Sequence, residues 1–207
     1  MSDARPLHFV PTAPTLPPEE EARANLYALL ARLFYLPPDR GLLQALAAAD
    51  ELPSEDGGAL AQAWSELAAA AGAADEDAVR EEYENRFIGT GKADVTLYTG
   101  AYTVKTAVDN PLVDIRAFMI ERGLARREDV HEPEDHIAGL CEIMRHLVAE
   151  QRAPVHEQRA FFKTFIAPAA NPLCDAIEAH PEVRFYKPVA RVARAFLDLE
   201  HATLDME

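Results

Sequence analysis

The sequence is poor in cysteine and contains none of the common catalytic loop motifs. Only two cysteines occur among its 207 residues, Cys141 and Cys174, and they do not form a Cys-x-x-Cys pair. A disulfide framework or structural zinc site is therefore not indicated, and we expect both to be small buried hydrophobic residues. The chain has no Gly-x-x-x-x-Gly-Lys, no dinucleotide-binding glycine turn and no Gly-x-Ser-x-Gly elbow. The enzyme classes that use these motifs are therefore not indicated, and we expect a non-catalytic protein with no bound cofactor.

Long apolar runs and basic residues are also scarce. No stretch approaches the roughly 18 consecutive apolar residues of a membrane-spanning helix, and the N-terminus lacks the apolar run of a secretory signal. Thirty-five acidic residues against twenty basic ones give a net charge of −15, which repels nucleic acid and anionic membranes. We expect a cytoplasmic protein with no nucleic-acid partner and no stable membrane insertion. A basic peptide fits this charge.

The composition and the spacing of apolar residues predict an all-α fold. Hydrophobic residues make up 49% of the chain but aromatic ones only 8%, because alanine and leucine dominate. No β-alternation or internal repeat is present. We expect a disordered or loosely docked arm over residues 1–18, which contain five prolines. The rest, 19–207, is predicted to form a single-domain helical bundle of roughly eight or nine helices, with a long irregular connector at about 88–109.

Start and stop signals place the individual helices. The apolar pattern predicts them at about 19–35, 39–49, 54–71, 75–87, 111–123, 133–150 and 184–203, with two shorter ones begun by Pro154 and by Asn171-Pro172. Ser54 and Asp75 are the expected N-caps of their helices. The acidic residues between 75 and 84, Glu82 among them, are interpreted as a solvated face.

The segment 131–136, His-Glu-Pro-Glu-Asp-His, gathers three carboxylates and two histidines. Pro133 suits a first helical turn, so we expect Glu132 to be the N-cap, with Glu134 and Asp135 just inside the helix. A helix N-terminus favours carboxylates, but three exceed what capping needs. The cluster fits three interpretations: a binding site for a cationic ligand, a metal site, or a solvated helix start.

Three motifs resemble the TorD/DmsD-type, NarJ-like family of redox-enzyme maturation chaperones. Tyr83-Glu84-Asn85-Arg86-Phe87-Ile88-Gly89 is similar to an aromatic-x-x-Leu-Phe-x-Gly motif at a helix end, with Arg86 in place of leucine. Leu97-Tyr98-Thr99-Gly100-Ala101-Tyr102 is similar to the aromatic loop that follows it in the family. Glu132-Pro133-Glu134-Asp135-His136 resembles the family's Glu-Pro-Glu-Asp-His signature, and Arg116 precedes it at a familiar distance.

The resemblance implies a chaperone for the catalytic subunit of a molybdenum-cofactor oxidoreductase. Its target would be a twin-arginine signal peptide or another N-terminal segment, and the protein would be a monomer or an exchangeable homodimer. Carboxylates pair with guanidinium groups, while aromatic side chains accept the apolar part of such a segment. The implied binding residues are Asp135, His136, Glu132, Glu134, Tyr98, Tyr102, Tyr83 and Phe87. A structural role competes at each position: caps for the acids, and core packing for Tyr83 and Phe87.

A metal-dependent helical-bundle enzyme is the alternative function. Its ligands would be Glu132, Asp135, His136, Glu142 and His146. Di-metal bundles repeat a Glu-x-x-His motif on two separate helices, and this sequence does not contain that repeat. The chaperone interpretation is therefore the preferred one.

Overall fold

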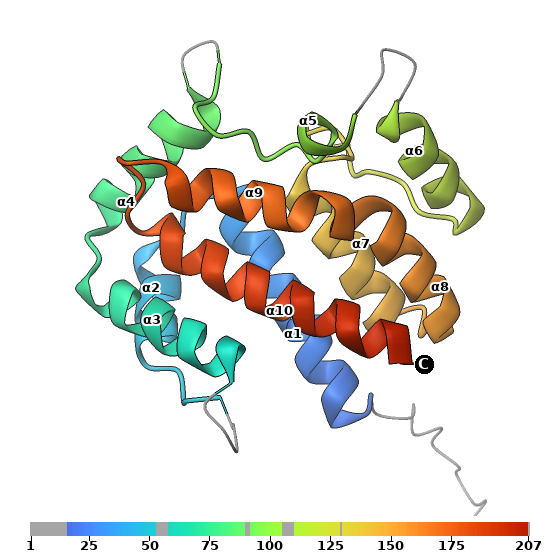
Figure 1. The fold of residues 1–207 in the computed structure, drawn as a ribbon, viewed down its shortest axis with the longest axis horizontal. Coiled ribbons are helices and arrows are strands. Elements are labelled where there is room, and N and C mark those ends of the chain that lie inside the picture. The colour runs from blue at the N-terminus through green and yellow to red at the C-terminus, as the bar shows by residue number, and fades with distance from the viewer. Residues whose placement is uncertain (1–15, 53–57, 90–91, 105–109, 129, 207) are drawn as a thin grey trace, which may run out of the picture.

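The computed structural model describes residues 16–52, 58–89, 92–104, 110–128 and 130–206, which form helices and no strand (Figure 1). The first half contains α1 (Pro18–Tyr35), α2 (Arg40–Ala47), α3 (Ala59–Ala73), α4 (Glu76–Tyr83), the π-helical segment η1 (Glu84–Ile88) and α5 (Gly100–Thr103). The second half contains α6 (Pro111–Glu121), α7 (Ile137–Ala149), α8 (Val155–Phe161), the π-helical segment η2 (Phe162–Ile166), α9 (Ala167–Ala179) and α10 (Tyr186–Met206). The all-α prediction is confirmed.

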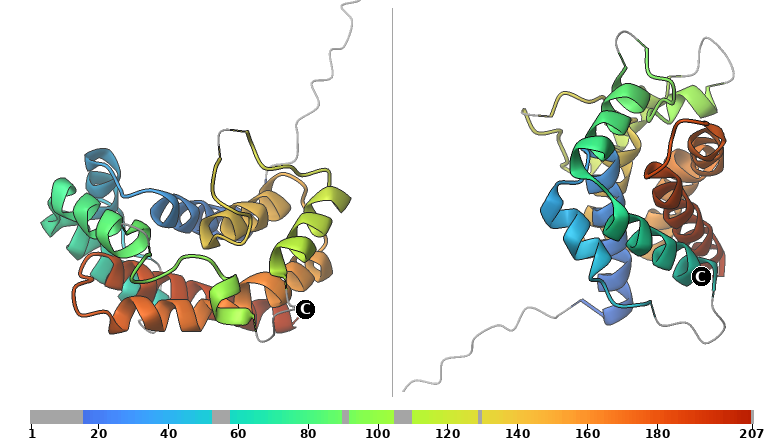
Figure 2. Two further views of the ribbon diagram at one scale, coloured as in Figure 1. Left: turned by 90° about the horizontal axis from the view of Figure 1, so that it is seen from above. Right: turned by 90° about the vertical axis from the view of Figure 1, so that its left-hand side faces the viewer.

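The helices form two layers that are clearest from above (Figure 2). α1 and α7 lie side by side in one layer, and α9 and α10 pair in the other. α2, α3 and α4 close one end, and α6 and α8 lie at the opposite end. None of the helices in the described ranges is long and apolar enough to cross a membrane.

The core lies between these layers, and α7 is central to it, as its apolar face predicts. Leu140, Met144 and Leu147 of α7 are fully buried. Both cysteines are buried and free, as expected. Aromatic side chains fill the interior from other helices: Tyr27 and Phe34 from α1, Phe161 and Phe162 from the α8–η2 segment, and Tyr186 and Phe196 from α10. Fully burying side chains of this size contributes roughly 1.5–3 kcal/mol each.

Several predicted helix ends are confirmed. The side chain of Asp75 accepts a hydrogen bond from the backbone N–H of Ala78 at 3.0 Å, so it caps α4. Gly123 has a φ of +67°, the left-handed conformation that ends α6. Ser54 and most of the N-terminal arm lie outside the described residues, but the prediction that Ser54 caps the third helix is wrong, because α3 begins at Ala59 with Gly58 as its N-cap.

Two further predictions about helix boundaries are wrong. Asn171-Pro172 does not start a new helix, because Pro172 lies inside α9 and the chain is helical from Val155 to Ala179 through η2. Packing explains this continuity, since Ala169, Leu173 and Ile177 on one face of α9 are buried in the core. Tertiary burial here outweighs the local cost of proline. The second wrong boundary is the start of α7, which is described with the site below.

Glu82 is not part of a solvated face. Its carboxylate accepts backbone hydrogen bonds from Arg184 at 2.9 Å, Phe185 at 3.1 Å and Tyr186 at 3.0 Å. These N–H groups lead into α10, so a residue of α4 caps a helix about a hundred positions later. The solvated-face interpretation is wrong at this residue.

The predicted connector runs from η1 to α6 and packs against the bundle where it is described. Val95 and Leu97 are buried, and α5 lies against α9. Residues 90–91 and 105–109 fall outside the described ranges. The connector brings the motif containing Tyr98 to the start of α7.

Candidate functional site

The second and third motifs meet through backbone hydrogen bonds. The N–H of Thr99 donates to the carbonyl of Asp135 at 2.9 Å, and the N–H of Ile137 donates to the carbonyl of Leu97 at 2.9 Å. These bonds form an isolated antiparallel bridge between Tyr98 and His136. Two segments almost forty residues apart therefore form one unit.

His136, not Glu132, is the N-cap of α7. Its Nδ1 atom accepts a hydrogen bond from the backbone N–H of Ala138 at 3.2 Å, so the helix begins at Ile137. Residues 132–135 therefore precede the helix, and the predicted start at Pro133 is wrong. The bridge to Leu97 and Thr99 explains the shift, because it holds the backbone of His136 in an extended conformation.

Burial keeps the imidazole of His136 neutral. The side chain lies against the ring of Tyr98 in an edge arrangement, with ring centroids 5.3 Å apart. Burial lowers the pKa of His136 to about 4, although the nearby Glu132 opposes this shift. The ring therefore acts at neutral pH as a hydrogen-bond acceptor and a packing surface.

Asp135 is a buried residue whose carboxylate is directed at the connector. Its Oδ2 atom accepts a hydrogen bond from the backbone N–H of Gly100 at 3.3 Å, and the hydroxyl of Thr99 donates to its carbonyl at 3.1 Å. A Cβ atom added to Gly100 would lie 2.8 Å from Oδ2, so a larger residue here would displace the carboxylate of Asp135. Burial raises the pKa of Asp135, and the Gly100 hydrogen bond partly offsets that effect.

Glu132 and Glu134 have different partners. The hydroxyl of Tyr98 donates to Glu132, and burial together with this bond raises the pKa of Tyr98 to about 12. Glu134 instead accepts two guanidinium contacts from Arg116, from Nε at 3.0 Å and from Nη2 at 2.9 Å. Burial alone would raise the pKa of Glu134, but the hydrogen bonds and charges of Arg116 and Arg126 lower it.

The aromatic members of the implied site are divided between the core and the connector. Tyr83 is buried and donates from its hydroxyl to the carbonyls of Phe34 and Tyr35, each at 2.9 Å. Phe87 is buried against Tyr186, with ring centroids 4.8 Å apart. Tyr102 is partly buried and donates to the carbonyl of Thr96 at 2.8 Å. Of these aromatics, Tyr98 directly contacts the Glu132–His136 segment.

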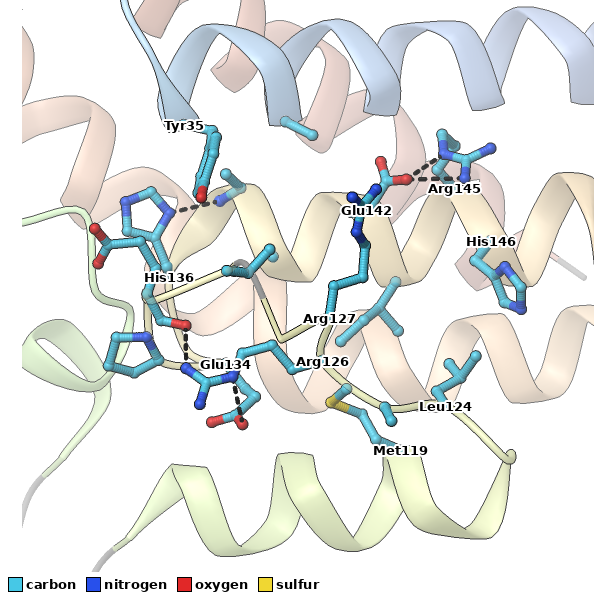
Figure 3. A pocket seen from close by; sticks show the side chains of 18 of the residues that line it. Tyr35, Met119, Leu124, Arg126, Arg127, Glu134, His136, Glu142, Arg145 and His146 are labelled. Atoms are coloured by element: carbon cyan, nitrogen blue, oxygen red, sulfur yellow. Dashed lines mark hydrogen bonds and ion pairs between the residues drawn. The ribbon is translucent and has the colours of Figure 1, made fainter.

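A groove of about 580 Å³ runs between α1, α7 and the chain that joins α6 to α7. Its floor includes small residues of the two helices, Ala28, Ala31, Ala138 and Gly139. Met119, Leu124 and Val130 line the wall on the α6 side. Tyr35 and His136 lie at one end, and Arg145 and His146 at the other (Figure 3). The motif segment thus forms part of the wall of an apolar groove.

Charges in the groove are balanced. The charged lining residues are Arg32, Arg126, Arg127, Arg145, Glu132, Glu134, Glu142 and Glu150. Many of them are already paired: Arg145 contacts Glu142 at 2.8 Å and Glu150 at 2.7 Å. The groove therefore combines an apolar floor with a rim of ion pairs, rather than three unpaired carboxylates.

A family model described as the nitrate reductase delta subunit matches residues 54–175, more than half of the chain. The chain belongs to this NarJ/TorD family of redox-enzyme maturation chaperones. It is 25% identical over 129 residues to the chaperone protein TorD of Photobacterium profundum, covering 57% of this chain and 60% of that protein. The match thus spans less than two thirds of that relative.

A solved structure from Archaeoglobus fulgidus, described as that of a redox enzyme maturation protein, has a similar fold. The TM-score is 0.52 at 19% sequence identity, and the match covers 94% of this chain and 99% of the other. This likeness concerns the fold alone.

The residues proposed for the metal-enzyme alternative do not assemble into a candidate site. Within the described ranges, no group of three or more His, Cys, Asp or Glu side chains is arranged to hold a metal ion. Glu142 pairs with Arg145, and His146 Nδ1 lies 2.8 Å from Glu150. No observation in this NarJ/TorD chain favours that alternative.

Sequence reasoning missed much of the groove lining. Ala28, Ala31 and Tyr35 line the groove from α1, a helix for which no site residue was predicted from the sequence. Arg126 was not assigned to the site, yet it contacts the carbonyls of His131 and Glu132 at 3.3 and 3.0 Å. The spacing of small residues along α1 was the available signal, since alanines allow close approach of another chain.

Proposed function

We propose that this protein binds the N-terminal segment of a molybdenum-cofactor oxidoreductase catalytic subunit in the groove between α1 and α7. The segment is a twin-arginine signal peptide or its equivalent in a partner that is not exported. Binding keeps the apoprotein available for folding and cofactor loading, and release permits assembly or export. The relative named as a TorD chaperone supports this class of function for the chain.

The observation that carries the proposal is the position of the Glu132–His136 segment beside an apolar groove. A twin-arginine leader offers guanidinium groups followed by apolar side chains, so its receptor needs carboxylates next to an apolar surface. Glu132 and Glu134 line the groove together with Ala28, Ala138 and Gly139. Small residues on the floor leave room for large apolar side chains of the guest.

Glu132 is the first carboxylate that we assign to an arginine of the guest. Its side chain receives a hydrogen bond from the neutral hydroxyl of Tyr98, whereas Glu134 is ion-paired with Arg116. An arriving guanidinium gains a charge-assisted contact at Glu132, worth roughly 1.5–3 kcal/mol. Asp135 and His136 act indirectly, because they fix the connector and the start of α7.

The energies fit reversible binding. One or two guanidinium contacts and a few buried apolar side chains, each worth roughly 1.5–3 kcal/mol, compete with the entropy of ordering a flexible peptide. The net result is a dissociation constant on the order of micromolar. A chaperone that must release its client needs affinity of this kind.

Isothermal titration calorimetry with synthetic leader peptides tests the proposal. We expect the intact chain to bind a twin-arginine leader and to bind a version with both arginines replaced by alanine at least about tenfold more weakly. Glu132→Gln should weaken binding of the arginine peptide. Glu121→Gln, at an exposed residue of α6, is the matched control and should leave it unchanged. Absence of heat with leaders and with unprocessed catalytic subunits alike contradicts the proposal.

A further inference from the structure

Glu134 holds two of the protein's own arginines at once. Arg116 of α6 contacts its Oε2 atom through Nε at 3.0 Å and Nη2 at 2.9 Å. Arg126, from the chain between α6 and α7, places its Nε 3.7 Å from Oε1. Two guanidinium groups therefore converge on one carboxylate at the wall of the groove.

The exposures of the three side chains differ. The side chain of Glu134 is 10% exposed, whereas those of Arg116 and Arg126 are 54% and 39% exposed. A nearly buried carboxylate loses much of its hydration, so it needs a cationic partner at all times. A half-exposed arginine that leaves the pair returns to water at little cost. Glu134 therefore always needs a cationic partner, but one arginine can replace another in that role.

Arg126 and Glu134 both line the groove, and Arg126 also donates to the carbonyls of His131 and Glu132 (Figure 3). A guanidinium group bound at Glu134 therefore lies beside the Glu132–His136 segment, where we propose that the client peptide binds. We infer that Arg116 and Arg126 are an internal stand-in for the arginines of the client, which the client displaces from Glu134 when it binds. This inference rests on the proposed function and concerns the regulation of the same site.

The pairing of Glu134 with the protein's own arginines has a measurable consequence for client affinity. The client must exchange one guanidinium for another at Glu134, and such an exchange contributes little net affinity. Removing Arg116 makes Glu134 available with less competition. Because an exposed ion pair is weak, we expect Arg116→Gln to bind an arginine-bearing leader about threefold to tenfold more tightly. The gain should shrink at high salt, where charge interactions are screened.

The test is a calorimetric comparison of the full-length chain and four variants with one twin-arginine leader peptide. Arg116→Gln should bind more tightly than the unmodified chain, whereas Glu134→Gln, which removes the carboxylate at which the exchange occurs, should bind no more tightly than it. The double variant Arg116→Gln/Glu134→Gln should bind like Glu134→Gln alone. Arg80→Gln is the matched control, because Arg80 of α4 has a side-chain exposure of 51% and pairs with Asp77 at 2.5 Å. It should leave the affinity unchanged.

The outcomes separate this inference from the proposed function. If the unmodified chain binds the leader and Arg116→Gln binds it equally or more weakly, the inference that the protein's own arginines compete with the client is overturned, and the proposed function stands. If neither binds any leader, both are overturned. Far-ultraviolet circular dichroism checks that each variant is folded. If Arg116→Gln does not fold, Arg126→Gln removes the other guanidinium, and the same tightening is expected.

Discussion

Arg23 of α1 and Glu200 of α10 form a buried bidentate ion pair. Arg23 donates from Nε to Oε1 at 2.7 Å and from Nη2 to Oε2 at 2.9 Å. The hydroxyl of Tyr27 also donates to Oε2 at 2.9 Å, and Gln158 accepts from Arg23 at 3.0 Å. Burial alone would lower the pKa of Arg23, but Glu200 and Glu20 raise it above its usual value. The pair joins the two layers of the bundle.

Glu200→Gln should lower the free energy of unfolding by about 3 kcal/mol, because it leaves the guanidinium of Arg23 buried beside a neutral side chain. Glu20→Gln removes the more exposed partner of the same arginine and should cost less than about 1 kcal/mol. Urea denaturation followed by circular dichroism measures both values. Equal losses in the two variants would show that burial of Glu200 does not determine how much its ion pair contributes to the free energy of unfolding.

The free energy of unfolding should decrease as the pH is lowered from about 6.5 to about 4, because of His136. In the folded chain its pKa lies at about 4, while the ordinary value is 6.5. As the pH falls, the unfolded state binds the proton first, so the contribution is complete above 6.5, decreases toward pH 4 and is constant below that. The size of the effect is roughly 3 kcal/mol.

His136→Asn isolates this contribution from the carboxylates, whose titration overlaps it. Asparagine retains an acceptor for the N–H of Ala138 but does not titrate. The difference in unfolding free energy between the two proteins should therefore change across this pH window. A difference that is constant from pH 7 to pH 4 would be inconsistent with a buried neutral imidazole.

Gly139→Ala should stabilise the fold while weakening client binding. A Cβ atom there would meet the carbonyl oxygen of Glu134 at an ordinary 3.5 Å, and alanine in a helix is worth roughly 0.5–1 kcal/mol over glycine. The added methyl group narrows the floor of the groove. Gly72→Ala in α3, with Ala47 Cβ at 3.6 Å, is the matched control. It should give similar stabilisation in thermal unfolding and leave the peptide affinity unchanged. Equal affinities of the unmodified chain, Gly139→Ala and Gly72→Ala would mean that the client does not bind in the groove.

Glu82→Ala should cost about 2 kcal/mol of stability, because three backbone N–H groups before and at the start of α10 lose their acceptor. The exposed neighbour Glu81 provides the control, and Glu81→Ala should change the free energy by less than about 0.5 kcal/mol. Guanidinium denaturation of both variants makes the comparison. Similar small losses would mean that water replaces the carboxylate without penalty.

The local pattern of the sequence predicted the helices well, because it determines which face of each helix is buried. Asp75 and Gly123 were sufficient to locate helix ends, since capping and left-handed backbone are local properties. The start of α7 was predicted four residues early because its true cap, His136, is selected by the bridge to the connector. Pro172 misled for a similar reason, since burial of its neighbours decides that α9 continues.

The candidate site was predicted less completely than the fold. The Glu132–His136 segment and Tyr98 were identified, and the structure brings them together. The partners of the carboxylates were not predicted, because Arg116 and Arg126 reach Glu134 through the path of α6 and the following chain. Glu82 and α10 show the same limitation, since a contact over a hundred residues has no local sequence signal.

The groove between α1 and α7 is the central element of this account, and hydrogen-exchange mass spectrometry with and without a saturating twin-arginine leader tests it most directly. We expect slower exchange in the C-terminal half of α1, in residues 124–136 and in the first turns of α7, with no change in α3 or α10. Protection confined to α3, α4 or α10 while the peptide is bound would contradict the account.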